Sequence, residues 1–213
     1  MKRRKPVLPE YPDRATLEQA ARRALDLDED VENLLFEDDV LEGLEGTSLT
    51  FSGCVFRRVR FGENDFSHLN LLDCRLDHCD FSGFRLPEGS MHRVEALQCR
   101  GMGAQLDRSV LRDVLFDQCR LGYLTVSECR LLQTAFADCE LENLLLYGCQ
   151  LKDAAFERCR MTAAEVTGTS LAGVDLSTDD ISGLKAQLEC LKGAEISVVQ
   201  APELCALMGL VIR

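Results

Sequence analysis

Residues 111–161 read LRDVL FDQCR LGYLT VSECR LLQTA FADCE LENLL LYGCQ LKDAA FERCR M when they are written in groups of five. Every complete group begins with Leu, Phe or Val, so one large apolar side chain recurs at every fifth position. The same phase runs from Phe51 to Ile181 without an insertion or a deletion, and 25 of its 27 positions are Phe, Leu, Ile, Met or Val. These residue types form about a third of the chain, so chance would place only about eight of them there. The exceptions are Ala96 and Gly101.

The position two residues before each large residue is occupied by a small side chain. It holds nine of the eleven cysteines, which are Cys54, Cys74, Cys79, Cys99, Cys119, Cys129, Cys139, Cys149 and Cys159. Elsewhere it holds mostly Ala, Ser, Thr or Val, and the other three positions of each group are mostly polar residues or Gly. A period of five fits neither a helix, which repeats every 3.6 residues, nor a strand, which repeats every two.

A five-residue unit with one large and one small inward side chain can form one side of a square coil. Four such units, or about 20 residues, then complete one turn, and successive turns stack at the strand spacing of about 4.8 Å. The large residues fill the interior, and the small residues pack near the corners. The sequence therefore predicts an all-β solenoid whose core is a tube of mostly Leu and Phe.

The cysteines are predicted to be packing residues. Cysteine is small, apolar and polarizable, which suits an inward position near a corner. Cysteines stacked in one column would have parallel Cα–Cβ bonds, a geometry that a disulfide does not accept. The sequence has no CxxC pair and no histidine in the cysteine column, so we expect free thiols and neither a metal site nor a cofactor.

The repeat divides the chain into three expected parts. These are an N-terminal extension and cap at residues 1–48, the solenoid at residues 49–197, and a C-terminal helix and tail at residues 198–213. A solenoid needs caps because its terminal coils expose unpaired edges and an apolar core. Asp13 is expected to cap a helix that ends near Leu25. At the other end, a short helix is expected from about Gln200 to Met208.

The weakest part of the repeat is the coil at residues 86–105, LPEGSMHRVEALQCRGMGAQ. Two of its large positions hold Ala96 and Gly101, which are too small to fill the tube. We therefore expect a thinner or bulged coil here, with Pro87 and Gly89 turning outward.

Composition limits the class of partner. The 213-residue chain has a formal net charge of −12, from 24 basic and 36 acidic residues. Nucleic acids and anionic membranes attract positive charge, so this balance argues against direct binding to either and allows a basic protein surface. No apolar run approaches the ~18 residues of a membrane span, and no apolar segment of a secretory signal follows the basic start MKRRK. We expect a cytoplasmic protein.

Acidic side chains are expected to predominate on one side of the solenoid, the side whose large residues include Leu106, Val126 and Val166. The carboxylates expected to contact a partner are Asp65, Asp107, Glu128 and Glu165, followed by Asp117 and Asp138. An acidic rod can imitate the charge of duplex DNA. A solvated surface that only keeps the protein soluble accounts for the same charge.

The sequence contains no catalytic motif. Its three histidines, His68, His78 and His92, fall one or two positions after a large residue and should face outward. No nucleophile at a motif spacing, phosphate-binding loop or nucleotide fingerprint accompanies them. Repeat solenoids usually offer surfaces rather than pockets, so we expect a binding protein and not an enzyme.

The units of five, with a small residue two positions before a central Leu or Phe, resemble the pentapeptide-repeat family over residues 51–181. That resemblance implies a right-handed quadrilateral β-helix. The C-terminal residues resemble the Qnr quinolone-resistance subfamily, at Gln200-Ala201, Leu204, Leu207 and Gly209-Leu210-Val211-Ile212. The stretch GSMHRV at residues 89–94 is also similar to chromosomal proteins of the Qnr type.

The Qnr resemblance implies a cytoplasmic homodimer joined through the C-terminal helices. The interface residues that it suggests are Gln200, Leu204, Leu207, Met208, Leu210 and Ile212. It also implies binding to DNA gyrase and topoisomerase IV, relief of their inhibition by fluoroquinolones, and DNA mimicry as the explanation. From the residues alone, the apolar C-terminus fits either capping of the last coil or capping together with dimerisation.

One feature departs from the Qnr pattern. Several Qnr proteins carry loops that project from the coils, and the unbroken phase of this chain leaves no room for a loop unless its length is a multiple of five. The alternative function is therefore a scaffold or interaction module with an unrelated protein partner. A third is a self-resistance factor against a gyrase-directed peptide toxin.

Overall fold

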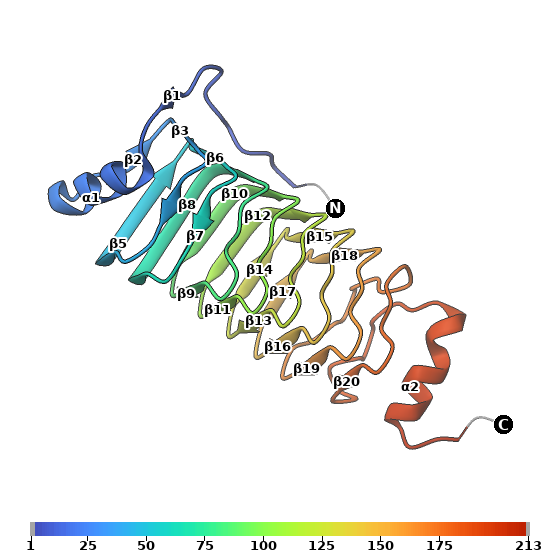
Figure 1. Ribbon diagram of the computed structural model, residues 1–213. Coiled ribbons are helices and arrows are strands. Elements are labelled where there is room, and N and C mark those ends of the chain that lie inside the picture. Colours follow the sequence, from blue (N-terminus) through green and yellow to red (C-terminus); the bar gives the residue numbers. More distant parts are fainter. Residues whose placement is uncertain (1–2, 212–213) are drawn as a thin grey trace.

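The computed structural model describes residues 3–211, apart from the side chains of residues 65–67. The chain forms a parallel β-solenoid of about nine turns, with helix α1 (Leu17–Leu27) at one end and helix α2 (Ala201–Leu207) at the other (Figure 1). From Val31 onwards the paired strand residues lie 20 positions apart, as Leu131 and Leu151 do, whereas Asp13 and Arg14 pair with residues 21 positions further on. One coil therefore contains four units of five residues, and the predicted fold is confirmed.

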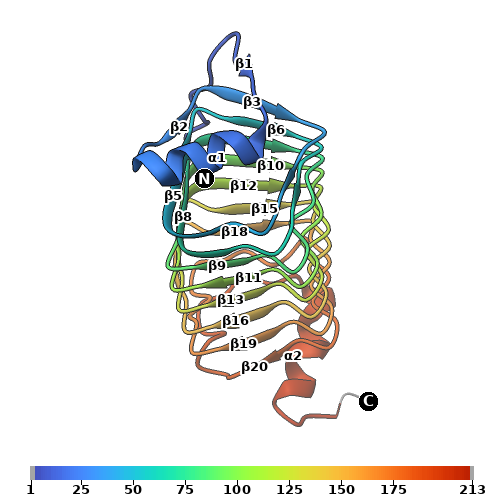
Figure 2. The same ribbon diagram turned by 60° about the vertical axis from the view of Figure 1, so that its left-hand side comes forward.

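The four units of a coil build four walls, which we name after one inward residue each. A twelve-stranded sheet forms two of them, the Leu111 wall and the Phe116 wall. Its strands are β1 (Asp13–Arg14), β2 (Val31–Glu32), β3 (Leu34–Glu37), β5 (Glu45–Ser52), β6 (Val55–Arg57), β8 (Asp65–Asp77), β10 (Ser90–Leu97), β12 (Val110–Asp117), β14 (Arg130–Leu132), β15 (Ala135–Ala137), β17 (Gln150–Lys152) and β18 (Ala155–Glu157). Figure 2 shows these strands stacked as the rungs of the solenoid.

A separate six-stranded sheet forms the Leu106 wall from Arg85 onwards, and the first residues of β5 and β8 form its earlier coils. This wall lies opposite the Phe116 wall because one unit separates the two on either side of the coil. Its strands are β9 (Arg85–Pro87), β11 (Gln105–Asp107), β13 (Thr125–Ser127), β16 (Leu145–Tyr147), β19 (Glu165–Thr167) and β20 (Lys185–Ala186). Strands β4 (Val40–Leu41) and β7 (Arg60–Phe61) pair with each other near the N-terminal end.

The fourth wall, the Leu121 wall, is built mainly from turns. Its coils are joined by single parallel bridges, such as the one between Arg120 and Glu140. Between the bridges the N–H of Leu124 donates to the carbonyl of Leu121 at 3.1 Å, and Tyr123 has a φ of 60°. A positive φ at the third residue is what a type II turn requires, so this wall is not a flat sheet.

The large residues of the four walls form one continuous core. On the Phe116 wall, the rings of Phe116, Phe136 and Phe156 lie above one another with planes 6° apart and centroids 4.9 and 5.2 Å apart. Stacked rings of this kind add to the free energy gained by burying their apolar surface. The tube is thus held together by contacts between equivalent residues of successive coils.

Where the small position of a unit holds Cys, Ser or Thr, its side chain joins neighbouring coils by hydrogen bonds. The Sγ of Cys139 donates to the carbonyl of Phe116 in the preceding coil at 3.4 Å and to the carbonyl of Ala137 at 3.3 Å. The hydroxyl of Ser109 makes the equivalent two contacts. A side chain that is small and also carries a donor therefore suits this position, which explains why Cys, Ser and Thr share it.

All eleven cysteines are free thiols, and all but Cys205 are buried. Burial raises the pKa of the Cys54 thiol to about 11 and that of Cys129 to about 12, because a thiolate would lose its hydration there. These two thiols stay protonated at neutral pH, so they pack and donate hydrogen bonds rather than act as nucleophiles.

The ladder of residues paired 20 positions apart begins at Val31, and not at residue 49 as expected from the sequence. Val31, Phe36 and Leu41 each pair with the residue 20 positions later, so the period of five extends further towards the N-terminus. At Gly46 the period lacks its large residue, and the side chain of Leu25 from α1 fills the space that this residue would occupy. A Cβ on Gly46 would lie only 2.7 Å from the Cδ2 of Leu25.

Helix α1 covers the first coil at the N-terminal end (Figure 2). Its residues Leu17 and Ala24 are buried on the face that meets the solenoid. The helix begins later than expected, because Thr16 is the N-cap and Asp13 lies in strand β1. The first helical N–H, that of Leu17, donates to Oδ2 of Asp39 in the solenoid at 2.7 Å.

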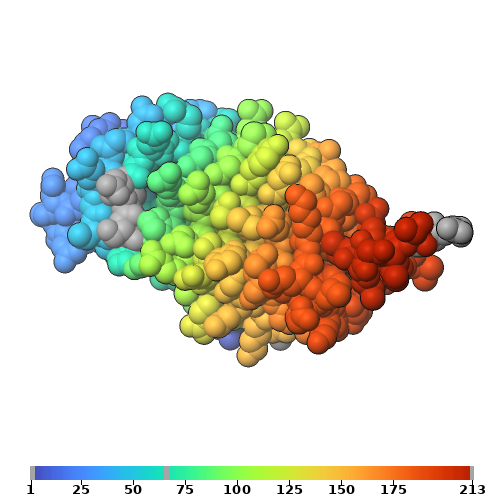
Figure 3. Space-filling view, turned by 90° about the horizontal axis from the view of Figure 1, so that it is seen from below, coloured from blue at the N-terminus to red at the C-terminus, as the bar shows by residue number. Residues whose placement is uncertain are grey.

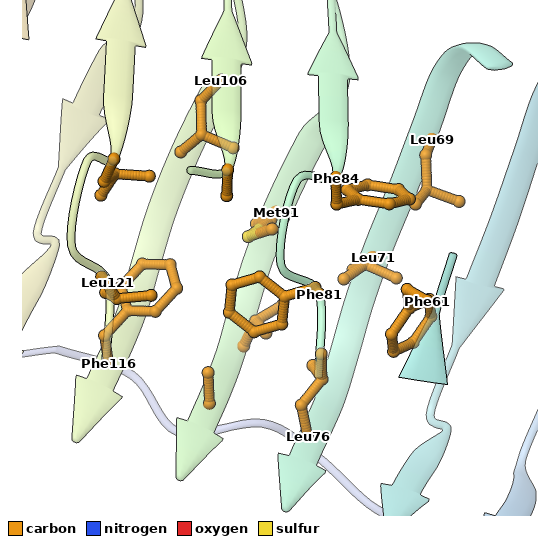
Figure 4. A pocket seen from close by; sticks show the side chains of 14 residues that line it. Phe61, Leu69, Leu71, Leu76, Phe81, Phe84, Met91, Leu106, Phe116 and Leu121 are labelled. Atoms are coloured by element: carbon orange, nitrogen blue, oxygen red, sulfur yellow. The ribbon is translucent and has the colours of Figure 1, made fainter. Parts of the chain in front are cut away.

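The weakest coil of the repeat keeps the register without a bulge, and Gly89 is buried, so the expectation of a bulged coil with Gly89 turned outward is wrong. Pro87 lies in β9 and pairs with Asp107 at the end of its sheet, where a strand can lack one N–H without breaking the ladder. Phe81 occupies the space beside Gly101, since a Cβ there would lie 2.1 Å from its ring. Beside Ala96 the core keeps an apolar cavity of about 40 Å³, which is too small for an organic ligand (Figure 4).

Candidate binding surfaces

Three of the expected contact carboxylates lie on the Leu106 wall or at its corner. Asp107 in β11 accepts hydrogen bonds from Arg108 Nε at 3.0 Å and from Ser127 Oγ at 3.1 Å, so its charge is partly compensated. Glu128 is exposed at the corner that follows β13, and Glu165 is exposed in β19. Neither glutamate makes an ion pair within residues 3–211 as described.

The fourth carboxylate expected on this wall is Asp65. Its backbone belongs to β8 and pairs with Glu45 of β5. Its side chain lies outside the described part of the structure, so no contact is assigned to it.

The remaining two carboxylates lie on the opposite side of the rod. Asp117 is on the outer face of β12 in the Phe116 wall, and Asp138 is at the corner that follows β15. Both oxygens of Asp138 accept hydrogen bonds from the Arg158 guanidinium at 2.7 Å, which holds the pKa of Asp138 below its usual value. The six expected carboxylates therefore do not form one contact patch.

Ion pairs between successive coils compensate much of the negative charge. Arg158 and Asp138 illustrate the pattern, in which an arginine pairs with a carboxylate 20 residues away. The other pairs with this spacing include Arg58–Asp38, Arg75–Glu95, Arg93–Asp73 and Arg108–Glu88. A count of the charges on each wall does not reveal these ion pairs. A search of the sequence for opposite charges 20 residues apart would have found them.

The C-terminal segment closes the far end of the solenoid. Gln200 is buried, and its side-chain amide donates to the carbonyls of Leu176 and Asp179 at 2.7 Å each. Leu204 and Leu207 of α2 pack against the core. These three residues, which the sequence suggested for a dimer interface, make contacts within their own chain.

Exposed apolar residues surround α2. Val199 precedes the helix, and Met208, Leu210 and Val211 follow it; each is more than half exposed. This end projects from the body of the molecule in Figure 3. Ile212, also expected at the interface, lies outside the described residues. These exposed apolar residues are a candidate interaction surface.

The described residues contain no cluster of three His, Cys, Asp or Glu side chains that could hold a metal ion. Neither helix of the described chain has the length and apolar character needed to cross a membrane. What the arrangement offers chemically is therefore a set of outward carboxylates, guanidinium groups and apolar residues at fixed spacing.

Comparison with known proteins identifies the repeat. The family model of the pentapeptide repeat region matches residues 69–145 and 111–185 of this chain. A second family model, of eight copies of the pentapeptide repeat, matches residues 47–83. Among solved structures, a trypsin-treated form of QnrB1, a plasmid-mediated fluoroquinolone resistance protein, is 20% identical over 87% of this chain and 90% of that chain, with a TM-score of 0.39.

A second solved structure is HetL, a pentapeptide repeat protein involved in heterocyst differentiation regulation, from the cyanobacterium Nostoc sp. strain PCC 7120. It is 18% identical over 82% of this chain and 92% of that chain, with a TM-score of 0.37. No curated protein sequence matches the chain.

Proposed function

This chain belongs to the pentapeptide-repeat family, and from that premise we propose that it is a cytoplasmic, non-catalytic protein that binds DNA gyrase or topoisomerase IV. In this proposal the outward carboxylates take the place of DNA phosphates on the basic DNA-binding surface of the topoisomerase. Occupation of that surface protects the enzyme from fluoroquinolones. The partner is a protein, and neither nucleic acid nor a membrane is bound directly.

The observation that carries the proposal is that exposed carboxylates lie on the Leu106 wall of a rigid rod with a net charge of −12. Glu128 and Glu165 face solvent on this wall or at its corner, and the partly exposed Asp107 lies on the same wall. Because every coil is hydrogen-bonded to its neighbours, these groups are ordered before binding and little conformational entropy is lost when a partner docks. The C-terminal residues that resemble the Qnr subfamily favour a topoisomerase as that partner.

A supercoiling assay tests this function. The purified protein is expected to restore DNA supercoiling by gyrase in the presence of ciprofloxacin. The double variant Glu128→Gln/Glu165→Gln should require about tenfold more protein for the same protection, because it removes two uncompensated charges from the contact. Protection should also weaken as salt concentration rises.

The matched control is Glu157→Gln, which removes an exposed carboxylate of β18 in the Phe116 wall, across the rod from the Leu106 wall. This variant is expected to protect gyrase as the wild type does. Absence of rescue, together with absence of binding to gyrase and topoisomerase IV at low salt, would refute the proposal.

The second candidate function is an interaction scaffold with an unrelated protein partner. The ion pairs between coils favour it, because pairs such as Arg158–Asp138 interrupt the acidic surface that DNA mimicry needs. Binding to a partner without any effect on topoisomerase inhibition would support this function.

We also propose that two chains associate through the apolar surface around α2. Met208, Leu210 and Val211 remain exposed after the helix has capped the last coil, and pairing with a second copy would cover them. Light scattering is expected to give twice the chain mass of 23.8 kDa. Leu210→Glu should shift the protein to the monomer, and a wild-type monomer at tens of micromolar would contradict this interface.

A further inference from the structure

A basic segment near the start of the chain lies against the outside of the solenoid. Residues 3–7, RRKPV, which we call the strap, follow the corner between the Leu111 wall and the Phe116 wall. Figure 1 shows this segment passing from β1 along the coils towards the middle of the rod. Pro6 and Pro9 favour extended backbone for the residues before them, which keeps the segment straight.

The backbone of the strap matches the spacing of the coils. The N–H of Val7 donates to Oδ1 of Asp73 at 2.9 Å, and the N–H of Arg4 donates to Oδ1 of Asp113 at 2.8 Å. The two acceptors are 40 residues apart, which is two coils or roughly 10 Å along the axis. Three residues of extended chain also span roughly 10 Å. An extended peptide can therefore meet the carboxylates of alternate coils at this corner with every third N–H.

A single arginine provides the side-chain contact. The guanidinium of Arg3 donates to Oε1 of Glu95 at 2.9 Å, and Arg75 donates to Oε2 of the same carboxylate at 2.9 Å. The Arg3 side chain is only 12% exposed and that of Glu95 only 7%. Burial raises the pKa of Glu95, but the two guanidinium groups outweigh it and hold this pKa below its usual value.

The corner beneath the strap presents several carboxylates that can accept hydrogen bonds. Asp73, Glu95 and Asp113 lie there beside the guanidinium groups of Arg75, Arg93 and Arg112. The strap adds two arginines and a lysine to this surface. Charge-assisted hydrogen bonds to carboxylates are the strong ones, so a positively charged segment is the ligand that this surface fits.

We propose that this corner is a binding site for an extended, arginine-bearing basic segment of a protein partner, and that the strap occupies it in the free protein as an internal competitor. Within the described residues the strap is held by three hydrogen bonds to side-chain carboxylates and joins no strand, so it can detach without opening the solenoid. The site lies across the rod from the Leu106 wall, and its occupation does not depend on topoisomerase binding.

Competition by a peptide in trans tests the site. A fluorescently labelled peptide with the sequence MKRRKPVLP is titrated with the full-length chain, and its binding is followed by anisotropy. The Arg3→Glu chain, whose own strap is weakened, is expected to bind the peptide at least about tenfold more tightly than the wild type. Adding Glu95→Gln to that chain should lower the affinity for the peptide about tenfold, because the arginine contact is lost.

Asp153→Asn in the Arg3→Glu background is the matched control. Asp153 occupies the same corner column two coils beyond Asp113 and makes no contact with the strap in the described structure, so peptide binding should be unchanged. Thermal unfolding verifies that each variant is folded. The proposal is overturned if the Arg3→Glu chain binds no more tightly than the wild type, or if Glu95→Gln leaves its affinity unchanged.

Discussion

Replacement of Phe136 by aspartate is expected to abolish cooperative folding of the solenoid. Phe136 is 2% exposed and stacks between Phe116 and Phe156. Truncation of a buried Phe to Ala costs about 3–5 kcal/mol, and an unpaired carboxylate in the apolar tube adds a further cost. Because the whole free energy of unfolding of a domain is only about 5–15 kcal/mol, most of the variant chains should be unfolded at room temperature.

The adjacent residue provides a control with the same new side chain. Ala137 follows Phe136 in β15 and belongs to the outward column that already contains Asp117 and Glu157. Ala137→Asp should therefore melt within a few degrees of the wild type when unfolding is followed by circular dichroism. A Phe136→Asp chain with the melting curve of the wild type would show that the inward assignment is mistaken.

The repeat could be predicted from the sequence because a solenoid depends on local rules. Each unit contacts its two neighbours along the chain and the units 20 residues away, so one period fixes both the fold and the register. The walls were less predictable. The Leu121 wall consists of turns closed by backbone hydrogen bonds, such as the one from the Leu124 N–H to the Leu121 carbonyl, and the large residues alone give no sign of this.

The N-terminal boundary of the solenoid was not predicted correctly because a side chain of helix α1 fills the core position of one coil. Gly46 breaks the period of five, yet the coil continues because Leu25 of the preceding helix fills its place. Phe36 and Leu41 were in phase and could have revealed the first coil. A glycine in a repeat therefore does not end it when a distant residue supplies the missing volume.

The candidate surfaces were predicted only in part. The outward position of residues such as Glu128 follows from the period, but the charge that a wall presents depends on pairs between coils. Asp138 was expected to meet a partner and instead accepts both hydrogen bonds from Arg158. The strap was beyond sequence reasoning, since Arg3 meets Glu95 across 92 residues and no repeat relates them.

A buried acid, Asp179, stands in the column of small residues that contains Cys139 and Cys159. It follows Cys159 in the column, and its Oδ1 accepts a hydrogen bond from the N–H of Cys159 at 2.6 Å. Its Oδ2 has no hydrogen-bond partner among the described residues. Cysteine at this position also donates to two carbonyls, as Cys139 does, whereas an ionised carboxylate has no proton to donate. Burial accordingly raises the pKa of Asp179 to about 6.

The substitution Asp179→Asn is therefore expected to stabilise the protein at pH 7.5, by on the order of 2 kcal/mol. Between the ordinary pKa of 3.8 and the folded value of about 6, the folded chain holds a proton that the unfolded chain has released. The stability gained from this proton is fully present below pH 4 and is lost as the pH rises through 6. Asparagine keeps the acceptor for Cys159 and carries an N–H donor at every pH.

Thermal unfolding of the wild type and the variant at pH 4 and pH 7.5 measures this effect. The melting temperature of Asp179→Asn should exceed that of the wild type at pH 7.5, and the difference should shrink towards pH 4 as Asp179 becomes protonated. Asp180→Asn is the control. Asp180 is exposed, and hydrogen bonds from Ser182 hold its pKa below the usual value, so its loss should not raise the melting temperature at pH 7.5. An Asp179→Asn gain of equal size at both pH values would mean that the buried charge is not its cause.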